Sequence, residues 1–115
     1  MRRLKLTITV IVFSKSYCPH SKRAKDILER YEINPAPFIV ELDQHPLGPR
    51  IQARLQELTG RRTVPNVLIN AVSIGGGDDV AALDESKKLV AKVLELGANK
   101  IEAKEKPSDA SHGLK

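Results

Sequence analysis

Hydrophobic positions in the first third of the chain follow two different periods. From Leu6 to Phe13 the apolar residues first alternate with polar ones and then become continuous, as in a strand buried on both faces. After Cys18 the spacing is three or four residues, which defines one face of a helix through Ala24, Ile27, Leu28 and Tyr31. Pro19 suits the first helical position, where its missing N–H costs nothing. The pattern predicts a strand over Leu6–Phe13 and then a helix that begins at Cys18.

The middle of the chain predicts a second strand–helix pair. A break at "NPAP" precedes an apolar run over Phe38–Leu42, which is typical of a strand. After "DQHPLGP", one face of an amphipathic helix is marked by Ile51, Leu55 and Leu58. Gly60 follows in the position where a left-handed residue commonly ends a helix.

The last part of the pattern predicts a hairpin and two helices. The short apolar runs Val67–Ile69 and Val72–Ile74 are separated by Asn70 and Ala71, although alanine is a poor residue for a positive φ. After "GGGDD", a short helix is indicated by Val80 and Leu83. A further helix that ends at Gly97 is indicated by Leu89, Val90, Val93 and Leu94.

This order of elements defines the fold class. A strand–helix–strand unit followed by two strands and a helix makes an α/β protein with a mixed sheet and helices on both faces. The length of 115 residues and the apolar fraction of 41% fit one domain, which we place at residues 1–97. Residues 98–115 form a charged tail without apolar period from about residue 103 onward, and we expect it to be disordered.

Charge and terminal composition change this picture little. The net charge of +5 favours anionic partners, but aromatic residues make up only 3% of the chain, too few for a nucleic-acid stacking surface. We therefore expect no nucleic-acid partner. The basic and then apolar start resembles a signal peptide but lacks a small-residue cleavage site, and no apolar run approaches the ~20 residues of a membrane span.

The single cysteine carries the candidate chemistry. One cysteine excludes a disulfide within the chain. At a helix N-terminus, Cys18 meets unpaired backbone N–H groups that stabilise its thiolate, with added positive charge from Lys15, Lys22 and Arg23 and a hydroxyl from Ser21. A buried structural cysteine is the alternative, which the polar neighbours disfavour. A thiolate without a resolving cysteine can still form a mixed disulfide, which an external thiol must then release.

Three stretches together resemble the glutaredoxin family, a group with the thioredoxin fold that uses glutathione as the external thiol. They are "FSKSYCPHS", "QELTGRRTVPNVLIN" and "IGGGDD". Cys-Pro-x-Ser is similar to the monothiol members of the Cys-Pro-Tyr-Cys class. The stretches "ELDQH" and "TVPNVLINAVSIGG", with a tail ending in "KEKPS", resemble fungal glutaredoxins of the early secretory pathway.

The resemblance implies roles for residues on both sides of the cysteine. Cys18 would be the nucleophile that takes the glutathionyl group, and Lys15, Gln52 and Arg62 would hold the glycine carboxylate of glutathione. Val64 would pair through its backbone with the cysteinyl part, next to a cis bond at Pro65.

The γ-glutamyl end of glutathione would lie at the glycine run. Gly76 and Gly77 would allow close approach of the backbone, and the N–H groups of Asp78 and Asp79 would bind the carboxylate at a helix N-terminus. The Asp79 side chain would face the ligand's ammonium. Asp78 has a second reading as a simple helix cap, and Arg61 is expected to be a plain surface charge.

Two positions depart from the family pattern. His20 stands where tyrosine is usual, so the wall beside the thiol is smaller and titratable, while direct base catalysis by His20 is disfavoured because neighbouring side chains at a helix start point apart. Gly77 stands where some relatives have a second cysteine.

The resemblance implies an oxidoreductase of redox homeostasis that reduces protein–glutathione disulfides, with glutathione and glutathionylated proteins as partners. The alternative is a dimer in which two Cys18 thiolates and two glutathiones hold a [2Fe–2S] cluster, which Pro19 disfavours. We expect a monomer without the cluster. As written the chain reads as cytoplasmic, whereas an anchor removed from upstream would place it in the lumen of the endoplasmic reticulum or Golgi.

Overall fold

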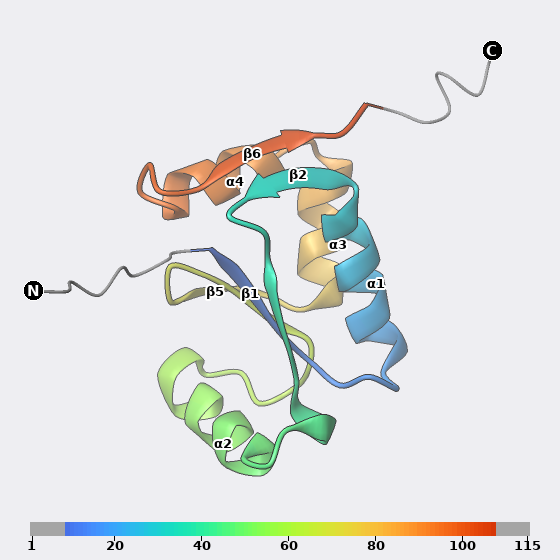
Figure 1. Cartoon of the computed structure of the whole chain (residues 1–115), viewed down its shortest axis with the longest axis vertical. Coiled ribbons are helices and arrows are strands. Elements are labelled where there is room, and N and C mark those ends of the chain that lie inside the picture. Colours follow the sequence, from blue (N-terminus) through green and yellow to red (C-terminus); the bar gives the residue numbers. More distant parts are fainter. Residues whose placement is uncertain (1–8, 108–115) are drawn as a thin grey trace, which may run out of the picture.

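The computed structural model describes residues 9–107, which form the elements shown in Figure 1. The strands are β1 (Val10–Ser14), β2 (Tyr31–Asn34), β3 (Phe38–Glu41), β4 (Asn66–Ile69), β5 (Val72–Gly75) and β6 (Glu102–Glu105). The helices are α1 (Pro19–Glu29), α2 (Gly48–Thr59), α3 (Gly77–Glu85) and α4 (Leu89–Leu96), and a 3-10 helix η1 covers Leu42–Gln44.

A four-stranded mixed sheet with the order β3-β1-β4-β5 forms the centre of the molecule. The strand β1 runs parallel to β3, which the chain reaches after α1 and β2, and antiparallel to β4, which follows α2. Its inward residues Val10 and Val12 are fully buried. The strand predicted over Leu6–Phe13 is confirmed from Val10 onward, and its positions 6–8 lie outside the described residues.

Helices cover the sheet on two sides (Figure 1). The helices α1 and α3 pack against each other on one side, and α2 lies on the other. The predicted α/β class, with a mixed sheet between helices, is therefore confirmed. The core joins the sheet to α1, α3 and α4 through a continuous cluster of buried side chains: Val10, Val12, Ala24, Ile27, Leu28, Tyr31, Ile33, Val67, Ile69, Val80, Ala81, Leu89, Val93 and Ile101. Within residues 9–107, every helix is too short or too polar to cross a membrane.

The first helix is shorter than its apolar period indicates. The prediction that Tyr31 lies on the helix is wrong, because α1 ends at Glu29 and Tyr31 begins the strand β2. In β2 the residues alternate between buried and exposed, with Tyr31 and Ile33 facing inward. Tyr31 fits the seven-residue spacing of a helix face and the two-residue spacing of a strand equally well. Its secondary structure therefore depends on the segment with which it pairs.

That partner lies in the segment predicted to be a disordered tail. The prediction is wrong for Glu102–Glu105, which form β6 and pair antiparallel with β2 in a separate two-stranded sheet. Ile101, just before β6, is 2% exposed and belongs to the core. The polar composition of β6 conceals the strand because one face is open to water, and Ile101 supplies the apolar anchor. The rest of the predicted tail, residues 108–115, lies outside the described part of the chain.

Turn and cap residues behave as their chemistry dictates. Gly60 has φ 79° and ends α2 in the left-handed conformation, as predicted. Asn70 and Ala71 turn the β4–β5 hairpin with φ values of 52° and 69°, so the predicted hairpin forms despite the alanine. Leu58, placed by its spacing on the apolar face of α2, is instead 65% exposed.

Candidate active site around Cys18

Cys18 is the residue that caps the N-terminus of α1, and Pro19 is the first residue inside the helix. The turn before it is closed by the Cys18 N–H, which donates to the carbonyl oxygen of Lys15 at 3.0 Å. The Lys15 N–H in turn donates to Ser21 Oγ at 3.3 Å, so the turn is tied to the first helical turn. The predicted start of a helix at the cysteine is confirmed.

The pKa of the Cys18 thiol lies below its ordinary value as the balance of opposing effects. Partial burial of the sulfur is the largest effect and raises the pKa, but the backbone N–H and hydroxyl of Ser21, the N–H of His20 and the charge of Lys15 together outweigh it. The sulfur remains partly exposed. A larger fraction of the thiol is therefore ionised near neutral pH, and the thiolate is the nucleophilic form.

Two of the cations predicted to assist the thiolate are paired elsewhere. Lys22 lies 3.0 Å from Asp26, one turn along α1. Arg23 lies 2.8 Å from Asp78 on α3. Lys15 is the cation that contributes directly to the lower pKa of Cys18, because it precedes the helix and sits beside the turn.

The loop between α2 and β4 brings a cis-proline into the site. The Val64–Pro65 bond is cis, as predicted, and Pro65 is buried. A chain of hydrogen bonds fixes the ends of this loop: Asn66 Nδ2 donates to Thr59 Oγ1 at 3.1 Å, and Ser73 Oγ donates to Asn66 Oδ1 at 2.7 Å. Because Asn66 is 1% exposed, these bonds are shielded from water and hold the loop rigidly.

The N-terminus of α3 is capped by Asp79 rather than by Asp78. The Gly76 N–H donates to Asp79 Oδ2 at 2.9 Å, and Arg61 Nη2 lies 3.2 Å from the same oxygen. Gly75 has φ 108°, and a Cβ at this position would collide with the Asp79 carboxylate. Arg61, expected to be a plain surface charge, therefore joins the cis-proline loop to α3. Its only sequence signal was its place in "TGRRTVP".

Glycines allow the three segments to meet. A Cβ on Gly77 would lie 3.1 Å from the carbonyl oxygen of His20, and one on Gly76 would lie 3.1 Å from the carbonyl oxygen of Pro65. The start of α3 therefore contacts both the cysteine helix and the cis-proline loop. His20 itself is exposed beside Cys18.

Two cations of the predicted site, Lys15 and Arg62, form no ion pair in the described part of the chain. Gln52 Nε2 donates to the carbonyl oxygen of Arg62 at 2.8 Å, which ties α2 to the loop before the cis-proline. The charges of Lys15 and Arg62 remain available to an anion.

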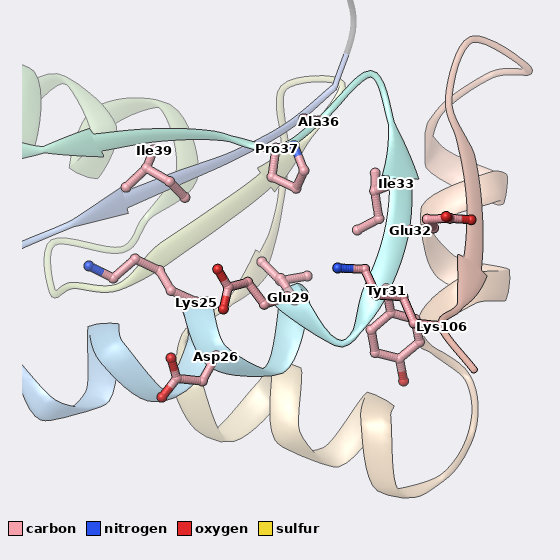
Figure 2. A pocket seen from close by; sticks show the side chains of 11 residues that line it. Lys25, Asp26, Glu29, Tyr31, Glu32, Ile33, Ala36, Pro37, Ile39 and Lys106 are labelled. Atoms are coloured by element: carbon pink, nitrogen blue, oxygen red, sulfur yellow. The ribbon is translucent and has the colours of Figure 1, made fainter. Parts of the chain in front are cut away.

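A separate cavity of about 440 Å³ lies away from this site (Figure 2). It is bordered by α1, β2, the loop before β3, and Lys106, with Tyr31, Ile33, Pro37 and Ile39 among its lining residues. Neither Cys18 nor any other predicted site residue lines it. The candidate chemistry therefore belongs to the surface around Cys18 and not to this cavity.

A partly exposed cysteine at the start of α1, a cis-proline loop and a mixed sheet between helices together define a protein of the thioredoxin superfamily. Residues 10–74 match the family model for glutaredoxin, more than half of the chain. The chain belongs to the glutaredoxin family, and its single cysteine fits the monothiol type.

Two relatives illustrate the match. Glutaredoxin-C8 of Oryza sativa is 46% identical over 87 residues, which are 76% of this chain and 63% of the relative. Monothiol glutaredoxin-7 of Saccharomyces cerevisiae is 43% identical over 82 residues, 70% of this chain and 40% of the relative. The chain therefore spans less than two thirds of the length of either relative.

A solved structure supports the same assignment. The crystal structure of the buckwheat glutaredoxin–glutathione complex superimposes with a TM-score of 0.68 at 40% identity, covering 79% of this chain and 81% of that one. The fold predicted from the family resemblance is confirmed by this likeness.

Proposed function

We propose that this protein reduces protein–glutathione mixed disulfides, with Cys18 as its only redox-active thiol. The Cys18 thiolate attacks the glutathione sulfur, a bond forms between these two sulfurs, and the substrate leaves as a thiolate that takes up a proton. A second glutathione thiolate then attacks the new disulfide, which yields oxidised glutathione and regenerates Cys18. The glutathionyl group of the substrate and one added glutathione thus form the disulfide product, and the added glutathione is the reductant.

The lower pKa of a partly exposed, unpaired thiol carries this proposal. A thiolate available near neutral pH is what the first attack requires. Since the chain contains no second cysteine, the mixed disulfide has no internal route of release. Glutathione is the external thiol favoured by the family and by the buckwheat complex.

We infer the glutathione subsite from the two open cations and the glycine run. The unpaired charges of Lys15 and Arg62, with the Gln52 amide beside them, would bind the glycine carboxylate. The backbone of Val64, before the cis-proline Pro65, would pair with the cysteinyl part, and the exposed His20 side chain would form a wall beside the thiol.

The γ-glutamyl end would lie where α3 begins. Gly76 and Gly77 present backbone without side chains, and the first N–H groups of α3, those of Asp78 and Asp79, lack helical partners and attract a carboxylate. The Asp79 carboxylate would face the ammonium group of glutathione while it stays paired with Arg61.

The test is a glutathione-dependent assay on a glutathionylated peptide. We expect Cys18→Ser to be inactive, and Ser21→Cys to keep most of the activity, because release through external glutathione needs only one thiol. Arg62→Ala should raise the KM for glutathione about three- to tenfold, as expected for a lost charged contact. Arg54→Ala, which removes an exposed arginine paired with Glu57 on α2, is the matched control. Full activity of Cys18→Ser would rule the mechanism out.

The cluster-binding dimer is the competing function. Each chain would supply one thiolate, Cys18, so two chains and two glutathiones would be needed for four ligands. Pro19, held in the first turn of α1, makes the ligand-bearing segment rigid and disfavours this arrangement. A visible spectrum of protein purified without oxygen, in the presence of glutathione, separates the two: a colourless monomer supports the enzyme, and a coloured dimer supports the cluster.

A further inference from the structure

A carboxylate outside the predicted site holds the turn that carries the nucleophile. Asp43 lies in η1 and accepts two hydrogen bonds from Ser16, two residues before Cys18 in the sequence. The Ser16 N–H donates to Asp43 Oδ1 at 2.9 Å, and the Ser16 hydroxyl donates to Asp43 Oδ2. We name these two contacts the Asp43–Ser16 clamp. Gln44 Nε2 adds a weaker contact to Ser16 Oγ at 3.4 Å.

The parallel pairing of β1 and β3 explains why these residues meet. Ser14 is opposite Glu41 at the ends of the two strands. Because the strands are parallel, the segments that follow them leave the sheet at the same end. Ser16 and Asp43 each follow that pair by two positions. Below the clamp, Ser14 Oγ donates to Glu41 Oε1 at 2.6 Å, and Lys25 lies 2.7 Å from Glu41, so the strand ends themselves are firmly joined.

The clamp acts on a turn that has little other support. Ser16 and Tyr17 are exposed, and Tyr17 is 71% exposed. On the far side of the turn, the Cys18 N–H donates to Lys15 O, and the Lys15 N–H donates to Ser21 Oγ. The turn is therefore held at one end by the first helical turn and in its middle by Asp43.

The carboxylate is ionised throughout the range in which the thiol titrates. The pKa of Asp43 lies below its ordinary value, first because the Ser16 hydroxyl donates to it and then because the Ser16 N–H does. Lys15 also lowers it. Ser16 donates to both carboxylate oxygens of Asp43, and Asp43 forms no ion pair with Lys15 within residues 9–107.

We propose that Asp43 is a positioning residue for Cys18: through Ser16 it fixes the turn that places the sulfur and Lys15 at the N-terminus of α1. Its consequence for turnover rests on the proposed function, whereas its consequence for the thiol does not.

Two effects of Asp43 on the thiol have opposite signs and can be separated. A nearby negative charge raises the pKa of a thiol, so loss of the charge alone would lower it. Loss of the turn geometry weakens the donors that stabilise the thiolate, so loss of the clamp would raise it. Asp43→Asn removes the charge and keeps an oxygen for the Ser16 N–H, while Asp43→Ala removes both.

The experiment measures the rate of Cys18 alkylation by iodoacetamide against pH, in the whole chain without glutathione. We expect Asp43→Ala to raise the pH midpoint of alkylation, and Asp43→Asn to leave it unchanged or slightly lower. Glu57→Ala is the matched control, because it also removes one exposed carboxylate, paired with Arg54 on α2 and outside the site. Equal midpoints for Asp43→Ala and Glu57→Ala would overturn the proposal.

A double-mutant cycle tests that the effect passes through Ser16. Ser16→Ala should shift the midpoint in the same direction by less, and Ser16→Ala combined with Asp43→Ala should be no worse than Asp43→Ala alone. Additive shifts would contradict the clamp. If circular dichroism shows that Asp43→Ala does not fold, the alkylation midpoints of Ser16→Ala and Asp43→Asn test the proposal instead. A Ser16→Ala midpoint equal to that of the wild type would then overturn it.

Turnover then separates this inference from the proposed function. If the wild type deglutathionylates the peptide, Asp43→Ala should lower kcat/KM about three- to tenfold, the size expected for a lost charge-assisted pair. If the wild type is inactive but the alkylation midpoint still shifts, the positioning role stands and the proposed function fails.

Discussion

Ser21 connects the sequence of the active-site motif to the chemistry of the thiol. It stands three residues after Cys18, where a cysteine would complete Cys-x-x-Cys, and it is fully buried at the first turn of α1. Its hydroxyl accepts the Lys15 N–H, which leaves its own proton free to stabilise the Cys18 thiolate. A residue that removes the resolving thiol therefore also helps to ionise the remaining one.

We predict that Ser21→Ala raises the pKa of Cys18. The variant loses the hydroxyl donor but keeps the backbone N–H, so burial of the sulfur, the largest opposing effect, is less well offset. At pH values below the midpoint the thiolate fraction falls, and alkylation by iodoacetamide should slow. The pH dependence of the alkylation rate measures this. Ser86→Ala, at the exposed end of α3, serves as the control, and a Ser21→Ala profile equal to that of the control would contradict the prediction.

The pairing of β2 with β6 shows how a polar segment becomes a structural element. Along β6 only Ala103 is partly buried, and the remaining residues are exposed. The anchor is Ile101, which packs into the core so tightly that a Cβ on Gly97 would lie 3.0 Å from the Ile101 Cβ. The strand is held by its backbone ladder with β2, by the buried Ile101 just before it and by Ala103, which packs against the core.

We predict that Ile101→Ala destabilises the protein by about 2–4 kcal/mol, the usual cost of a large-to-small change at a buried site. The loss follows from the removed apolar contacts and from the cavity left beside Gly97. Urea denaturation followed by circular dichroism gives the free energy of unfolding. Glu102→Ala, one residue further and exposed, should change it by less than about 0.5 kcal/mol. Similar values for the two variants would mean that β6 is not anchored as described.

A hydrogen-bonded contact joins the start of β2 to α3. The Tyr31 hydroxyl donates to Asp84 Oδ1, and Arg30 lies 2.9 Å from Asp84 Oδ2. Asp84 is 15% exposed, so its carboxylate depends on these two partners. Burial, and then the Asp84 hydrogen bond and charge, raise the pKa of Tyr31.

We predict that Tyr31→Phe lowers the free energy of unfolding by about 1–3 kcal/mol at neutral pH, because Asp84 loses a donor in a shielded position. The sign of the pH dependence follows from the raised pKa. The folded state holds the Tyr31 proton more tightly than the unfolded chain, so its contribution is complete below pH ~10 and is lost as the pH rises above that value. Urea denaturation from neutral to alkaline pH tests both. Tyr17→Phe, which alters a 71% exposed tyrosine, should match wild type.

Neighbouring residues were enough to place most of the elements and the nucleophile. The helix start at Cys18 and Pro19, the turn at Asn70 and Ala71 and the helix end at Gly60 are local signals, because caps, fixed φ angles and apolar period act over a few residues. The combined motifs likewise indicated the family, since each motif is a contiguous run.

Pairings between distant residues required the folded chain. The local pattern at Tyr31 is equally compatible with a helix and a strand, and only pairing with β6, near the other end of the domain, makes it a strand. The sequence predicts Arg61 to be a surface charge, whereas the folded cis-proline loop places it beside Asp79. The sequence gives no indication of a role for Asp43, which meets Ser16 only because β1 and β3 pair in register. The physical reason is common to all three: a partner many residues away enters the local pattern only after the sheet has brought it within hydrogen-bonding distance.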